Sequence, residues 1–176
     1  FGTLVDSMPF WYRLGERYLL ARGKIPRPGL RADLATLSMT QTAQYLISQY
    51  GISDPVGTII ADINEMVSDF YLHSAPLKRG AAQFLARLRG RGVRLCVATA
   101  TDRPLVEGAR RRLGVLDAFT RIFTCTAVRA GKDRPDIYFC ALEHLGVAQE
   151  DALVFEDALH AIETAKAAGF RVAAVR

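Results

Sequence analysis

Hydrophobic residues gather into four short runs in the second half of the chain. The runs are RLCVATAT (94–101), RIFTCT (121–126), ALVFED (152–157) and RVAAVR (171–176). Because they lack polar alternation and are rich in β-branched residues, they predict strands that are covered on both faces. Helix-period segments accompany them at 79–91, 103–113, 134–146 and 158–168, the last ending at Gly169, a helix-stop signal. The alternation predicts a parallel sheet, whose ligands bind beyond the carboxyl ends of the strands.

The region 8–75 has a different pattern. Helical periodicity covers about 8–22, 39–50 and 56–73, with breaks at IPRPG (25–29) and GISDP (51–55), and no convincing strand. We therefore expect a helical cap of residues 10–75, inserted into an α/β core formed by residues 1–9 and 76–176. Pro9 and Pro76 lie near the two expected crossings.

Composition narrows the class of protein. Half of the 176 residues are hydrophobic, which suits a globular protein with a real core. No apolar run approaches the roughly 20 residues that span a bilayer, so we expect no membrane partner. The three cysteines are odd in number and lie among apolar residues, which favours reduced thiols and a cytoplasmic location.

The net charge of +5 has a large arginine component, concentrated in RLRGRGVR (87–94) and at 110–112. A basic patch could attract nucleic acid, but no aromatic interleaving and no nucleic-acid module accompanies it. Solvated helix faces explain these arginines, and we expect no nucleic-acid partner. The same positive field favours a small anionic substrate.

Three of the predicted strands end in polar residues. Thr99 and Thr101 follow the first, and Asp102 can cap the helix that starts near Pro104. Hydroxyl and backbone N–H groups at such a turn can bind an anion, although an ordinary capped turn gives the same pattern. Lys132, in AGKDRPDIY (130–138), could neutralise a phosphate, or it could be solvated like most loop lysines.

Glu156 and Asp157 end the third strand and open a helix in FEDALHAI (155–162). Carboxylates at this position could hold Mg²⁺, which favours hard oxygen ligands. Equally, Asp157 could be a helix N-cap and Glu156 could complement the helix dipole. All three polar groups are expected at one edge of one sheet, which favours a shared site.

These motifs together resemble the haloacid-dehalogenase superfamily of hydrolases, in the branch with phosphoglycolate phosphatase and β-phosphoglucomutase. The resemblance covers essentially the whole chain. GTLVDS (2–7) resembles the end of the first family motif, VATAT (97–101) the second, GKDRPDIY (131–138) the third and VFEDALHAIETAKAAG (154–169) the fourth. The resemblance implies an α/β fold with a Rossmann-like parallel core and an inserted helical cap.

The resemblance also implies residue roles. Thr99, the backbone of Ala100 and Lys132 would bind the phosphate of a small phosphorylated substrate, with Thr99 and Lys132 also counted as catalytic. Glu156 and Asp157 would hold Mg²⁺. Gly2 and Thr3 would shape the nucleophile turn and line the substrate site. The implied assembly is a monomer or a weak homodimer.

The family mechanism uses two aspartates in the first motif, a nucleophile that forms an aspartyl-phosphate and, two residues later, an acid/base. The alignment puts Phe1 at the second position and the nucleophile two residues ahead of it, with its strand. We expect a chain that starts at Phe1 to be unstable and inactive. Phe1 is either the start of a fragment or a true substitution; the fourth motif favours the fragment.

Other functions on this fold remain open at this level. They are a phosphosugar mutase, a dehalogenase, a phosphonate hydrolase and a non-catalytic protein that binds a ligand or a partner. The dehalogenase branch has an aromatic residue at the position of Phe1, but its chemistry needs no metal. The acidic pair therefore favours a Mg²⁺-dependent phosphatase.

Overall fold

A computed structural model describes residues 2–35 and 37–175. The chain divides into two compact units, one joining the residues up to Asp6 with those from Tyr71 onward, the other spanning Ser7–Phe70. The expected crossings were at 9/10 and 75/76, a few residues further along the chain. Phe1, which the sequence places at the acid/base position, lies outside the described residues. No helix among these residues is both long enough and apolar enough to cross a membrane.

The Ser7–Phe70 unit is helical. Its helices are α1 (Met8–Ala21), α2 (Leu30–Leu34), α3 (Met39–Tyr50) and α4 (Val56–Asp69). A capping box fixes the start of α3, because Ser38 accepts a bond from the Gln41 N–H while the Gln41 side chain accepts from the Ser38 N–H. Its core holds ten buried residues: Phe10, Leu14, Tyr18, Leu19, Leu30, Ala43, Leu46, Ile52, Ile59 and Ile63.

The other unit is an α/β core. Its strands are β1 (Cys96–Thr99), β2 (Arg121–Thr124), β3 (Leu153–Glu156) and β4 (Arg171–Ala174). Its helices are α5 (Ala81–Gly90), α6 (Arg103–Arg112), α7 (Cys125–Val128), α8 (Asp136–Leu145) and α9 (Leu159–Ala167). Short 3₁₀ turns cover Leu116–Ala118 and Gln149–Asp151, and a π-helical turn covers Phe70–Ser74.

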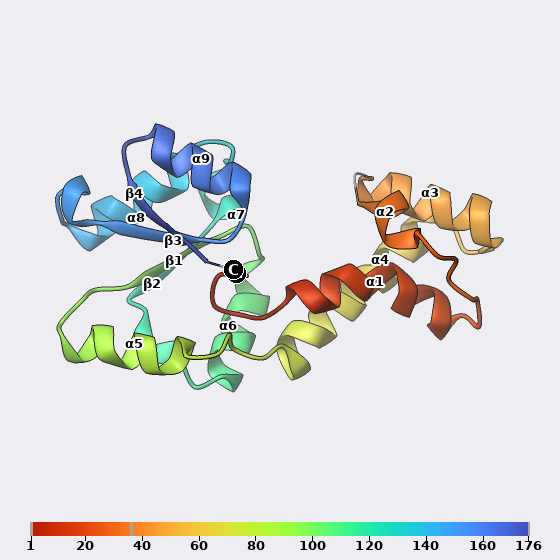
Figure 1. Cartoon of the computed structure of the whole chain (residues 1–176), viewed down its shortest axis with the longest axis horizontal. Helices are drawn as coiled ribbons and strands as arrows, with labels where there is room; N and C mark the ends of the chain where they lie inside the picture. The colour runs from red at the N-terminus through yellow and green to blue at the C-terminus, as the bar shows by residue number, and fades with distance from the viewer. Residues whose placement is uncertain (1, 36, 176) are drawn as a thin grey trace. The chain divides into compact units, whose positions relative to one another are not determined.

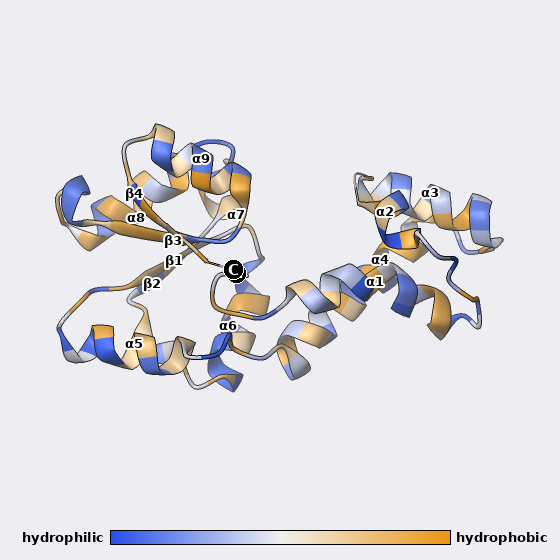
Figure 2. Ribbon diagram, viewed as in Figure 1, coloured by the Kyte–Doolittle hydropathy of each residue, from blue (hydrophilic) through white to orange (hydrophobic). Residues whose placement is uncertain are grey.

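The helices cover the strands in layers, with α8 and α9 on one side and α5 and α6 on the other (Figure 1). One cluster, built on Ile137, Tyr138, Ala165 and Phe170, packs against side chains of all four strands. A second cluster joins Val97 of β1, Ile122 of β2 and Val106 of α6. The strands are largely apolar in sequence, as the colouring in Figure 2 shows. This arrangement confirms the predicted α/β fold class.

The strands form two parallel pairs among the described residues, β1 with β2 and β3 with β4. A single continuous sheet was expected, so this is a difference in detail. On β3 the side chains of Leu153 and Phe155 are exposed, whereas Glu156 is buried. Phe155 meets Phe84 of α5 edge to face, with ring centroids 5.4 Å apart.

Several predicted boundaries shift for identifiable reasons. The strand expected to reach residue 126 ends at Thr124, because the Thr124 hydroxyl accepts a bond from the Ala127 N–H and starts α7. The helix expected to reach residue 73 changes to the π-helical turn after Asp69. The Arg112 guanidinium donates hydrogen bonds to the carbonyls of Tyr71 and Ala75, at the end of this turn, where backbone carbonyls lack a helical partner.

Candidate active site at the strand ends

The first polar group lies at the end of β1. Thr99 is fully buried, and its hydroxyl oxygen accepts a hydrogen bond of 3.0 Å from the Thr101 N–H. Ala100, between them, is exposed. Asp102 is at the N-cap position of α6 but makes no capping bond; its carboxylate accepts from the Thr126 hydroxyl at 3.4 Å. The predicted side-chain cap is therefore wrong in detail.

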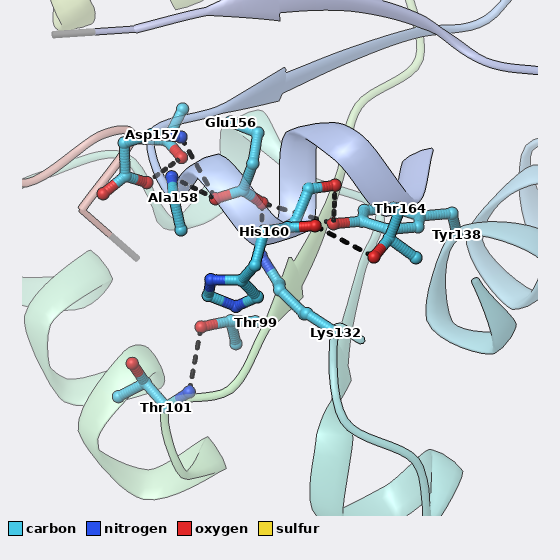
Figure 3. A network of polar contacts seen from close by, with 11 residues as sticks. Thr99, Thr101, Lys132, Tyr138, Glu156, Asp157, Ala158, His160 and Thr164 are labelled. Carbon is cyan, nitrogen blue, oxygen red and sulfur yellow. Dashed lines mark hydrogen bonds and ion pairs between the residues drawn. The ribbon is translucent and has the colours of Figure 1, made fainter. Parts of the chain in front are cut away.

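Lys132, in the turn between α7 and α8, makes a buried ion pair. Its Nζ lies 2.5 Å from Oε2 of Glu156, and the two side chains are only 9% and 4% exposed. The alternative of a solvated loop lysine is thereby excluded. The pair joins the turn that follows β2 and α7 to the end of β3, and Figure 3 shows it at the centre of a network of polar contacts.

Glu156 is hydrogen-bonded through both of its oxygens. Oε1 accepts from the N–H groups of Asp157 at 3.1 Å and Ala158 at 3.3 Å, ahead of α9. The Tyr138 hydroxyl lies 3.5 Å from Oε2 and 3.3 Å from the carbonyl oxygen of Ala161. Burial, and then the nearby Glu156 carboxylate, raise the pKa of Tyr138, so this hydroxyl stays protonated and can donate.

Asp157 faces the amino-terminal turn of the chain. Its Oδ1 accepts a 2.8 Å hydrogen bond from the Thr3 hydroxyl. A Cβ placed on Gly2 would lie 2.2 Å from Oδ2, so the carboxylate can keep this position only beside a glycine and would be pushed aside by a larger residue. Asp157 is not the N-cap of α9, since Ala158 occupies that position. The capping alternative for Asp157 is thereby excluded, while Glu156 does serve the N–H groups ahead of the helix.

The donor set can be compared with what a divalent cation needs. Among the described residues, no group of three or more Asp, Glu, His or Cys side chains is placed to hold a metal. Asp157 presents a carboxylate beside a glycine, which fits a hard cation that keeps most of its water. Both oxygens of Glu156 already bind Lys132 and two backbone N–H groups, so Glu156 fits a position next to a metal ligand and not that of a ligand itself.

The structure joins four of the residues singled out from the sequence in two contacts and places a fifth residue nearby. Lys132 binds Glu156, and Asp157 binds the Gly2–Thr3 turn. Thr99 lies at the same edge in Figure 3. Sequence reasoning missed Tyr138, although it ends the quoted run GKDRPDIY; a buried tyrosine on a helix next to the lysine turn was the available signal.

The chain thus combines an α/β core, which carries these residues at its strand ends, with a helical unit inserted in the sequence. A family model, the haloacid dehalogenase-like hydrolases, matches residues 1–169. The chain belongs to this family.

Known relatives agree with this assignment. Validoxylamine A 7′-phosphate phosphatase of Streptomyces hygroscopicus subsp. limoneus is 38% identical, over 96% of this chain and 78% of its own. Mitochondrial (DL)-glycerol-3-phosphatase 1 of Arabidopsis thaliana is 29% identical over 97% of this chain, which spans only 60% of that protein. A solved structure from Thermotoga maritima, described provisionally as a β-phosphoglucomutase, has a TM-score of 0.87 at 25% identity, covering 98% of this chain and 80% of its own.

Removing the cation of the buried pair should destabilise the protein. Lys132→Met leaves the Glu156 carboxylate buried without its partner, which costs about 3–5 kcal/mol of unfolding free energy. The double variant Lys132→Met with Glu156→Gln removes both charges and should recover most of the loss. Urea unfolding measures both, with Lys166→Met on the exposed face of α9 as the control. A double variant as unstable as the single one would contradict the ion-pair argument.

Two glycine substitutions should have effects of opposite sign. Gly2→Ala pushes the Asp157 carboxylate away from Thr3 and should cost about 0.5–1.5 kcal/mol, the value of a typical hydrogen bond. Gly57→Ala, in α4 with open space around it, should stabilise by up to about 1 kcal/mol through helix propensity. Thermal and urea unfolding report both values. Equal effects of the two changes would mean that the close approach at Gly2 is unimportant.

Proposed function

We propose that this protein is a Mg²⁺-dependent phosphatase of a small phosphorylated metabolite. The observation that carries the proposal is the buried Lys132–Glu156 pair at a strand end, with Thr99 at the same edge of the core (Figure 3). A lysine held in this way keeps a positive charge in a fixed position at an edge where backbone N–H groups also lie. A phosphate group has the charge and the acceptor atoms to match.

Each residue has a distinct part in this proposal. Thr99 and the N–H of Ala100 donate hydrogen bonds to the phosphate, and Lys132 supplies its counter-charge. Glu156 positions Lys132, and the Tyr138 hydroxyl supports the Glu156 carboxylate. Asp157 holds the metal, with Glu156 as its supporting acid, and Thr3 fixes the Asp157 carboxylate. Mg²⁺ would offset the repulsion between phosphate oxygens and the carboxylates around them.

The substrate class follows from the relatives by analogy. Two of them carry names of phosphatases, for glycerol 3-phosphate and for validoxylamine A 7′-phosphate. Both names describe removal of a phosphate group from a small polar molecule. We therefore propose a phosphate monoester of a small polar metabolite. As in the family mechanism, the helical Ser7–Phe70 unit would act as the cap that excludes water during the reaction.

Phosphate binding tests the anion site separately from catalysis. The charge-neutral pair Lys132→Met with Glu156→Gln should keep the fold but weaken binding of inorganic phosphate by roughly 10- to 100-fold, as expected for one charge-assisted bond. Thr99→Ala, which removes one neutral donor, should weaken it by about 2- to 10-fold. Calorimetric titration in low salt measures both losses. Equal affinity of the double variant and the unsubstituted protein would remove the phosphate role of Lys132.

The metal assignment is tested by measuring turnover. Asp157→Asn should lower Mg²⁺-dependent phosphate release by at least about 100-fold, since even changes outside the ligand shell cost roughly 10- to 100-fold. Asp151→Asn, on an exposed turn, is the control and should change turnover by less than about twofold. Asp157→Asn that keeps full activity with a chelator present would refute metal dependence at this residue.

A further inference from the structure

An arginine-rich pocket lies along helix α6, away from the strand-end residues. Arg103, Glu107, Arg110 and Arg111 are spaced i, i+4, i+7 and i+8, so they share one side of the helix. Facing them is the segment that leads into β2, with Phe119 and Arg121. Together with Thr120 and Ile122 they line an open groove of about 370 Å³. None of the lining side chains has a role in the proposed phosphatase site.

The charges in this pocket are not balanced within it. Four arginines face one acid, Glu107, whose Oε1 lies 3.4 Å from Nη1 of Arg103. Arg103 also donates to the carbonyl of Ile122 at 2.8 Å. Among the described residues, neither Arg111 nor Arg121 forms an ion pair with a carboxylate. Both are exposed, so they are available to a ligand.

Arg110 forms the buried part of the pocket lining. It is 3% exposed, and its guanidinium lies over the Phe119 ring, 4.9 Å from the centroid. Burial lowers the pKa of Arg110, whereas the carboxylates of Glu107 and Asp117 act in the opposite direction, and a guanidinium in a protein keeps its proton.

The spacing sets the size of the ligand. Arg103 and Arg111 are eight residues apart, which is about 12 Å along the helix axis. One phosphate group cannot contact both ends of such a row, but two linked phosphate groups can reach from Arg111 and Arg121 toward Arg103. Guanidinium groups bind phosphate oxygens in paired, planar contacts, which favours arginine over lysine for this task.

We propose that the pocket between α6 and residues 119–122 is a second anion site, which binds a small molecule with two or more phosphate groups. It differs from the strand-end site in its chemistry, because it recognises the ligand by several arginines and has no acidic pair for a metal. The site is independent of the phosphatase proposal. Its ligand would occupy it whether or not the strand-end residues hydrolyse anything.

Pyrophosphate is the probe for this site, with tripolyphosphate and inorganic phosphate as comparisons. In spectra of ¹⁵N-labelled protein, pyrophosphate should shift the arginine Nε–H signals that Arg111→Gln and Arg121→Gln assign. The double variant Arg111→Gln with Arg121→Gln should lose at least about tenfold in affinity, as expected for charge-assisted contacts. Inorganic phosphate should bind this pocket more weakly than pyrophosphate does.

A matched control separates a site from diffuse charge. Arg87→Gln with Arg89→Gln removes the same two charges from the exposed face of α5 and should change affinity by less than about twofold. The variant Lys132→Met with Glu156→Gln should keep pyrophosphate binding in the pocket. Equal losses in both arginine pairs, or pyrophosphate shifts confined to the strand-end residues, would overturn the proposal. So would the absence of any shift at Arg111 and Arg121.

Discussion

The buried ion pair between Lys132 and Glu156 is the contact on which the candidate site depends. It links the turn after β2 and α7 with the end of β3, two segments that share no strand pairing among the described residues. A buried pair is a poor source of net stability, because removing two charges from water is expensive. Its value here is geometric, since it sets where a positive charge and a carboxylate stand at one edge of the core.

The second constraint is the approach of Asp157 to the Gly2–Thr3 turn. Thr3 and Asp157 are 154 residues apart in the sequence, yet a 2.8 Å hydrogen bond joins them. A side chain at Gly2 would displace the carboxylate from this position. The hydrogen bond from Thr3 and the space left by Gly2 thus fix the Asp157 carboxylate, and they hold the amino-terminal turn against the end of β3.

The sequence predicts the four strands and the long helices, because their periodicity is local and extends over whole elements. It does not predict α2, whose five residues are too few for a period to register. It also does not predict which partners the polar strand-end residues choose. For Asp102, Lys132 and Glu156 the sequence allows both an ordinary structural role and a role in a binding site. Only the residues that contact them in the folded protein decide between the two. Pairing over more than twenty residues is decided by the path of the chain, not by local pattern.

The division of the strands into two pairs has a consequence for local opening. The amides of β1–β2 and of β3–β4 are bonded in separate ladders, so hydrogen exchange in one pair does not require breaking a backbone bond of the other. What they share is the side-chain layer around Ile137 and Tyr138. If the amides of both pairs exchange equally slowly, their exchange reports the free energy of opening the shared side-chain layer. If one pair exchanges faster, its exchange reports the free energy of opening that pair alone. The same helix, α8, thus contributes a hydroxyl to the polar network and the cohesion of the two ladders.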